Sequence, residues 1–128
     1  MPVTPITSIA HWNAAVEENT KQIIVVDFTA PAWCAPCRKI APYVKTIADT
    51  PTVVECGFEF FEVDVDHLPD LMKKYQVTAL PTFLIFYKGV VKHKIEGASR
   101  SKLKDAINTY YRLPYLEEDA QKARSWSQ

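Results

Sequence analysis

Two cysteines, Cys34 and Cys37, constrain this chain most strongly because they lie where one apolar pattern ends and another begins. Before them, residues 23–28 form a nearly continuous apolar run, as expected of a central strand that is buried on both faces. After them, Ile40 and Val44 begin an apolar series at helical spacing. The pair is therefore predicted to lie between a strand and a helix, with Cys34 near the helix N-terminus.

This position favours redox chemistry. Unpaired backbone N–H groups at a helix N-terminus stabilise a thiolate, which is the form of cysteine that attacks disulfides. Pro36 suits the first helical turn, where its missing N–H costs nothing. Zinc sites use the same cysteine spacing but need two more ligands. The remaining candidates, none of them paired at ligand spacing, are Cys56, His11, His67 and His93. We therefore favour a redox pair over a zinc site or a structural disulfide, and we expect no metal.

Composition narrows the class of protein. A length of 128 residues, with 48% hydrophobic and 23% charged residues, indicates a globular chain with one main domain. The net charge is zero and no basic stretch occurs, which argues against nucleic acid or anionic lipid as partners. No apolar run approaches the roughly 20 residues that span a membrane, and the N-terminus does not resemble a signal peptide. Three cysteines are too few for a disulfide scaffold, so we expect a reducing, cytoplasmic location.

Strand and helix patterns alternate along the chain, which predicts an α/β fold with parallel strands and a mixed sheet. The first half of the chain is predicted to form an edge strand at 3–6, a helix capped by Thr7 or Ser8, the central strand at 23–30, and a helix containing Pro42 that ends at 50–51. The second half is predicted to form a strand-rich region at 53–66, a short helix from Pro69, a hairpin of 82–87 and 90–95, and a helix capped by Ser99.

Asp27 interrupts the central strand. A carboxyl group inside such a strand is costly, and burial should raise its pKa. Buried acids near a reactive group are often functional, although an exposed carboxylate is the alternative. For Cys56 we favour the role of a small buried apolar residue over that of a regulatory thiol.

Further motifs agree with the cysteine segment. They are Val26-Asp27-Phe28, Pro42, Val63-Asp64-Val65-Asp66, Leu80-Pro81-Thr82, Lys88-Gly89 and Gly97. With Trp33-Cys34-Ala35-Pro36-Cys37, they make the chain resemble a eukaryotic thioredoxin over about residues 3–110. The resemblance implies a thioredoxin fold, with a five-stranded mixed sheet flanked by four helices. It also implies a thiol–disulfide oxidoreductase that reduces protein disulfides.

The resemblance also assigns residues. Cys34 corresponds to the attacking cysteine, Cys37 to the resolving one, Asp27 to the buried acid beneath them, and Pro81 to the family's cis-proline. A mostly apolar rim should bind the target chain, and it comprises Trp33, Pro36, Leu80, Pro81, Gly97 and Ala98. The chain has no nucleotide-binding motif, so electrons should come from an NADPH-dependent thioredoxin reductase. We expect a monomer with no cofactor beyond its redox-active disulfide.

The chain departs from the family pattern in several places. Ala35 replaces a usual glycine between the cysteines, and Pro31-Ala32 lengthens the preceding loop by one residue. A domain at 1–110 is followed by an extension, residues 111–128, which we expect to form a short extra helix rather than a frayed tail. The alternatives are a tryparedoxin- or nucleoredoxin-like relative with another electron donor, a protein disulfide isomerase-type domain, or a redox-dependent binding module that uses the extension.

Overall fold

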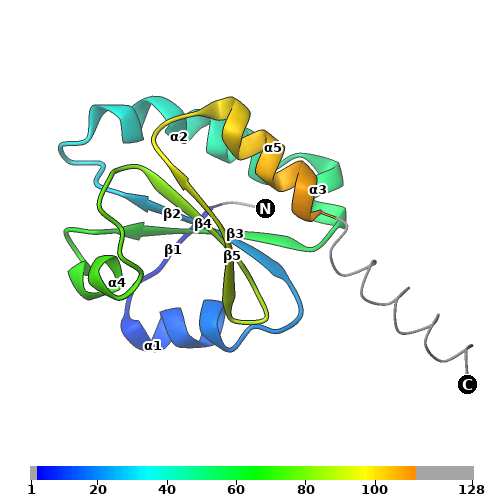
Figure 1. Cartoon of the computed structure of the whole chain (residues 1–128), viewed down its shortest axis with the longest axis horizontal. Coiled ribbons are helices and arrows are strands. Elements are labelled where there is room, and N and C mark those ends of the chain that lie inside the picture. Colours follow the sequence, from blue (N-terminus) through cyan, green and yellow to red (C-terminus); the bar gives the residue numbers. More distant parts are fainter. Residues whose placement is uncertain (1–2, 112–128) are drawn as a thin grey trace, which may run out of the picture.

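The computed structural model describes residues 3–111, which form a central sheet between two layers of helices (Figure 1). The sheet has five strands in the order β1-β3-β2-β4-β5. The strands are β1 (Thr4–Pro5), β2 (Ile23–Thr29), β3 (Phe58–Asp64), β4 (Thr82–Tyr87) and β5 (Val90–Glu96). The helices are α1 (Ile9–Trp12), which continues as a π-helical turn η1 (Asn13–Glu17), α2 (Ala35–Ala48), α3 (Pro51–Glu55), α4 (Pro69–Lys74) and α5 (Arg100–Tyr110).

Strand β2 is central in the sheet, which explains its nearly uninterrupted apolar sequence. It pairs with β3 in parallel and with β4 antiparallel, and all seven of its residues are buried. The hairpin of β4 and β5 makes the sheet mixed. The predicted fold class, a thioredoxin fold with a five-stranded mixed sheet, is therefore confirmed.

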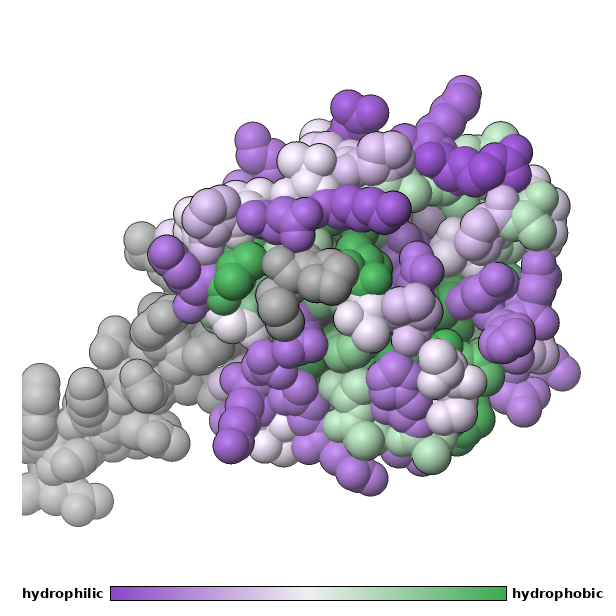
Figure 2. Space-filling model, turned by 180° about the vertical axis from the view of Figure 1, so that it is seen from behind, coloured by the Kyte–Doolittle hydropathy of each residue, from purple (hydrophilic) through white to green (hydrophobic). Residues whose placement is uncertain are grey.

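Each face of the sheet contributes to its own hydrophobic core. Alternate residues of β2, such as Val26 and Phe28, pack with Trp12 of α1 and Leu71 of α4. The intervening residues, such as Val25, belong to the second core with side chains of α2 and α5. On the face shown in Figure 2, the surface is mostly hydrophilic and hydrophobic side chains appear only in small patches. Burial on both faces of β2 thus fixes which way each of its side chains points.

The first core carries a polar network at its edge. The Glu17 carboxylate accepts hydrogen bonds from the Trp12 indole at 3.1 Å, from the Lys74 ammonium and from the Tyr75 hydroxyl. These bonds, with that from Lys74 as the largest cause, lower the pKa of Glu17 from 4.5 to about 2. The network ties η1 to α4, so it holds the helices of this layer together.

Segment 51–57 differs from the prediction. We expected strand from residue 53 and four helices, whereas α3 is an additional helix in the described part of the chain. Helix α2 ends at Ala48, shortly before the expected 50–51, and Pro51 occupies the first turn of α3, where proline is well tolerated. Val53 is buried in the second core and Val54 is exposed, as expected of neighbouring residues in a helix with one buried face. β-branched composition was a misleading signal in so short a segment.

The N-termini of α1 and α5 follow the predicted caps. The Ser8 hydroxyl accepts a hydrogen bond from the His11 N–H at 3.0 Å, and the Ser99 hydroxyl accepts one from the Lys102 N–H at 3.3 Å. Within residues 3–111, no helix is long and apolar enough to cross a membrane. The extra helix expected in the C-terminal extension falls on residues 112–128, outside the described residues.

Candidate active site

The sulfur atoms of Cys34 and Cys37 are joined in a disulfide, with the two Cα atoms 5.3 Å apart. Cys34 is the N-cap residue of α2, and its Sγ accepts a hydrogen bond from the backbone N–H of Cys37 at 3.3 Å. Cys34 is 6% exposed and Cys37 is 2% exposed, so Cys34 is the more accessible residue of the pair. A thiolate at Cys34 would therefore be stabilised by N–H groups at the start of a helix of 14 residues.

A tight turn connects β2 to the cysteines. The backbone N–H groups of Trp33 and Cys34 both donate to the Ala30 carbonyl, at 3.2 and 2.9 Å. The guanidinium of Arg38 donates to the Pro31 carbonyl at 3.0 Å and so ties the lengthened loop to the first turn of α2. The loop therefore accommodates its additional residue without moving Cys34 away from the helix N-terminus.

Trp33 lies open to solvent beside the disulfide, with 61% of its surface exposed. Its indole N–H donates to both carboxylate oxygens of Asp66, at 3.0 and 3.2 Å. The sequence did not identify Asp66 as this partner. Its only signal was its place at the end of an alternating apolar and acidic run, just after β3. The contact fixes the orientation of an aromatic ring that would otherwise be free to rotate.

Asp27 is buried, with 5% of its surface exposed, and its Oδ1 has no hydrogen-bond partner among residues 3–111. It shares a face of β2 with Val25, which belongs to the core under α2. Burial, and secondarily the nearby Glu62, raise the pKa of Asp27 from 3.8 to about 7. This carboxyl group can therefore exchange a proton near neutral pH.

Glu62 lies directly opposite Asp27 on β3 and is half-buried. Burial raises the pKa of Glu62, Lys45 of α2 acts in the opposite direction, and Asp64 raises it further. The carboxyl group of Glu62 thus opposes the ionisation of Asp27 on the neighbouring strand. Sequence reasoning missed the electrostatic effect of Glu62 on Asp27.

The cis peptide bond expected at Pro81 is present between Leu80 and Pro81. Pro81 is buried immediately before β4, and Thr82 lies opposite Phe28 near the end of β2. The Pro81 carbonyl accepts a hydrogen bond from the Gly97 N–H at 2.8 Å. Four rim residues from two segments, Leu80, Pro81, Gly97 and Ala98, are thereby brought together at the edge of the sheet that leads into the cysteine loop.

A second group of rim residues borders a pocket of about 300 Å³. Pro36 of α2 and Ala98 both line it, together with Ile40 and two cations, Lys39 and Arg100. The Arg100 guanidinium lies 5.4 Å from the centre of the Tyr43 ring, which restricts its position. Sequence reasoning missed both cations because the first turns of α2 and α5 are distant in the chain.

These features recur in one protein family. The Thioredoxin family profile matches residues 3–109. The chain belongs to the thioredoxin family. Thioredoxin H2 of Arabidopsis thaliana is 39% identical over 98 residues, which cover 77% of this chain and 68% of that protein. Thioredoxin-1 of Saccharomyces cerevisiae is 33% identical over 105 residues, which cover 82% of this chain and 95% of that protein.

Solved structures agree with the sequence comparison. The X-ray structure of Fasciola hepatica thioredoxin is 37% identical and has a TM-score of 0.75, and the match covers 84% of this chain and 98% of that one. Family membership and the Cys34–Cys37 disulfide together show a thiol–disulfide oxidoreductase that acts on proteins. Thioredoxins need no cofactor beyond that disulfide.

Other residues considered from the sequence lie outside this site. Cys56 is a free, half-buried thiol that packs against the second core. His67 and His93 are exposed, and His11 is half-buried. Among residues 3–111, no three or more histidine, cysteine or acidic side chains are grouped to hold a metal ion.

Proposed function

We propose that Cys34 is the attacking residue and Cys37 the resolving residue of this oxidoreductase. The Cys34 thiolate attacks one sulfur of a target disulfide, the target's S–S bond breaks, and its second sulfur leaves and takes up a proton. Cys37 then loses its proton and attacks the Cys34 sulfur, which releases the other target thiol. Two electrons pass to the target, and the Cys34–Cys37 bond forms. The observation that carries this assignment is the place of Cys34 at the N-cap of α2.

Asp27 accepts the proton of Cys37 in this proposal, either directly or through water. Its burial under the helix that carries Cys37 and its pKa of about 7 support the role, because a base is most effective when its pKa is near the working pH. Glu62 contributes by keeping that pKa high.

The target chain binds across the rim beside the disulfide. Trp33 and Pro36 are exposed, and Leu80, Pro81, Gly97 and Ala98 lie next to one another. Backbone groups beside Pro81 would pair with an extended segment of the target, which suits an enzyme with many substrates. Lys39 and Arg100 add positive charge on one side of this rim. We therefore expect faster reaction with targets that carry an acidic residue near the disulfide.

The electrons come from an NADPH-dependent thioredoxin reductase, and the domain acts as a monomer that transfers electrons in the cytoplasm. The similarity to thioredoxins such as those of yeast and Arabidopsis supports this assignment. A tryparedoxin-like chain would instead accept electrons from a trypanothione or glutathione system, and an isomerase-type domain would favour oxidation.

Insulin reduction tests the proposal. The full chain, coupled to NADPH and a thioredoxin reductase, should reduce insulin, and Cys34→Ser should abolish turnover. Cys37→Ser should also stop turnover, because the mixed disulfide is not resolved. Cys56→Ser is the matched control and should retain the full rate. Full turnover by Cys34→Ser would overturn the assignment, and reduction driven only by glutathione or trypanothione would identify a different electron donor.

A further inference from the structure

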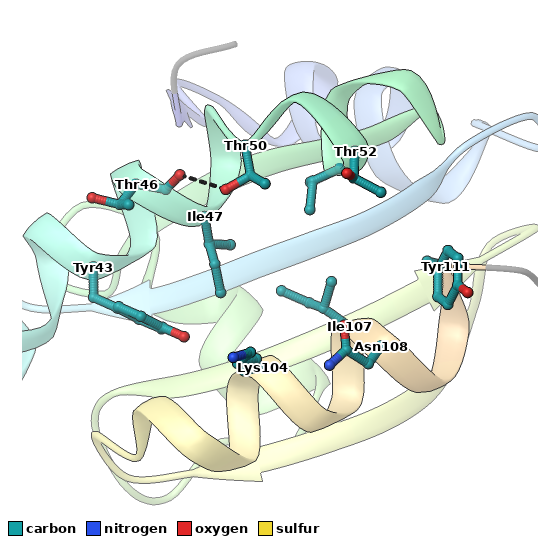
Figure 3. Close-up of a pocket in the computed structure, with 10 residues that line it drawn as sticks. Tyr43, Thr46, Ile47, Thr50, Thr52, Lys104, Ile107, Asn108 and Tyr111 are labelled. Carbon is teal, nitrogen blue, oxygen red and sulfur yellow. Dashed lines mark hydrogen bonds between the residues drawn. The ribbon is translucent and has the colours of Figure 1, made fainter.

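A groove of about 700 Å³ lies between α2, α3 and α5, on residues distinct from those of the rim. Figure 3 shows Ile47 of α2 and Ile107 of α5 pointing towards each other across this space. Tyr43 lines it near one end and Tyr111 near the other. The groove is therefore an elongated, largely apolar surface formed by helices from two separate parts of the chain.

Two of the polar residues that line the groove already have hydrogen-bond acceptors. The Thr46 hydroxyl donates to the Pro42 carbonyl at 3.0 Å, and the Thr50 hydroxyl donates to the Thr46 carbonyl at 3.0 Å. Both hydroxyls thus donate to carbonyl groups of α2. A ligand for this groove should bring aliphatic or aromatic side chains, because exposed apolar surface of this kind is stabilised when covered.

The chain itself continues from the groove into a segment that carries such side chains. Tyr111 lines it and is the last described residue, and 17 residues follow in the chain. Leu113, Tyr115 and Leu116 are among the first five of them. The groove extends along α5 from Tyr111 towards Lys104, about 10 Å at 1.5 Å per helical residue. Four extended residues cover about 13 Å, so this segment can span the groove if it turns back along α5.

The charges of the groove and of the C-terminal segment are also complementary. Exposed Lys104 lines the groove about two turns before Tyr111. In the sequence, Leu116 is followed directly by Glu117, Glu118 and Asp119. A segment that turned back with its leucines in the groove would bring these acids towards Lys104. Apolar residues and acids thus occur in the order that the groove requires.

We propose that the first part of the C-terminal segment, residues 112–119, binds in the groove between α2, α3 and α5 of the same chain. Leu113 and Leu116 provide the apolar contacts and the following acids face Lys104. Tethering favours this occupant over a second copy of the chain, because a short connection gives an effective concentration in the millimolar range. The segment then acts as a strap on residues outside the rim, and it takes no part in the chemistry.

Amide NMR spectra of the full chain test this directly. The double variant Leu113→Asp/Leu116→Asp should shift the amide signals of groove residues on α2 and α3, such as Ile47 and Val53. The matched control Ala123→Asp/Ser125→Asp adds the same charge further along and should leave those signals in place. Chemical-shift changes restricted to amides at the end of α5 would overturn the proposal. Shifts that grow with protein concentration would show a segment from another copy, which also contradicts it.

Binding in trans gives a second, independent readout. The family match ends at residue 109, and the Fasciola hepatica thioredoxin aligns over 98% of its length, so residues 1–111 contain the whole domain. A peptide of residues 112–128 should bind this shortened chain. Ile47→Asp in the groove should weaken binding about tenfold or more, because it places a charge against apolar side chains. Val54→Asp, an exposed position on α3, should change it less than about twofold. Equal effects of the two variants, or no binding, would refute the proposal.

Discussion

Replacing Asp27 with asparagine should stabilise the folded chain at alkaline pH. The wild-type carboxyl group is buried and its Oδ1 has no hydrogen-bond partner among the described residues, so ionising it in the folded state is costly. The difference between 3.8 and about 7 corresponds to about 4 kcal/mol, because each tenfold change in acidity is worth about 1.4 kcal/mol. An asparagine that leaves a buried amide partly unsatisfied loses about 1–2 kcal/mol of this gain. We expect a net stabilisation of about 2–3 kcal/mol at pH 8.

The sign of the pH dependence follows from the raised pKa. Between about pH 4 and pH 7 the folded state holds a proton on Asp27 that the unfolded state has lost. The contribution of this group to the free energy of unfolding is therefore fully present below the unfolded pKa, and it falls as pH rises through about 7. Asparagine does not titrate, so the stability gap between variant and wild type should widen from pH 5 to pH 8. Glu62 remains in both proteins and should leave a weaker pH dependence in each.

Urea unfolding of the oxidised proteins between pH 5 and pH 8.5 measures this gap. Asp105→Asn, which neutralises an exposed carboxylate on α5, is the matched control and should show no comparable change with pH. A gap between Asp27→Asn and wild type that is independent of pH would refute the reasoning. Lower stability of Asp27→Asn at pH 8 would do the same.

Three further predictions concern other parts of the structure. Glu17→Gln should lower stability by about 1–2 kcal/mol above pH 5, since it weakens hydrogen bonds to a charged acceptor. In an acid titration of unfolding this difference should shrink as pH falls from 4.5 towards 2. Gly89→Ala should lower the thermal midpoint more than Gly57→Ala. Both residues have positive φ, but only at Gly89 would the new Cβ lie 2.6 Å from a backbone oxygen, that of Glu17. Lys39→Glu with Arg100→Glu should raise the KM for a target with an acid beside its disulfide about threefold to tenfold, and should hardly affect a neutral target.

The main elements of the fold could be predicted because their signals are local. A buried central strand, a helix starting at a cysteine, and a hairpin with a Lys88-Gly89 turn each follow from a few adjacent residues. The interruption of an apolar strand by Asp27 likewise predicted a buried acid, since a charge at such a position stands out against its neighbours.

What could not be predicted depends on contacts between distant segments. The helical state of residues 51–55 depends on Val53 packing into a core built largely by α2, α5 and the sheet. The indole of Trp33 finds Asp66 only because β2 and β3 are parallel neighbours that end at the same edge of the sheet. The pocket lined by Lys39 and Arg100 needs the first turns of two helices to meet. The spacing of residues within one segment does not predict such contacts between distant segments.

The central claim is that Cys34 attacks the target disulfide and Cys37 resolves the intermediate. The most direct measurement is to mix reduced Cys37→Ser with a protein disulfide and to map the product by mass spectrometry. We predict a stable mixed disulfide between the target and Cys34, with Cys56 left free. A bond from the target to Cys56, or release of fully reduced target without any trapped complex, would contradict the mechanism.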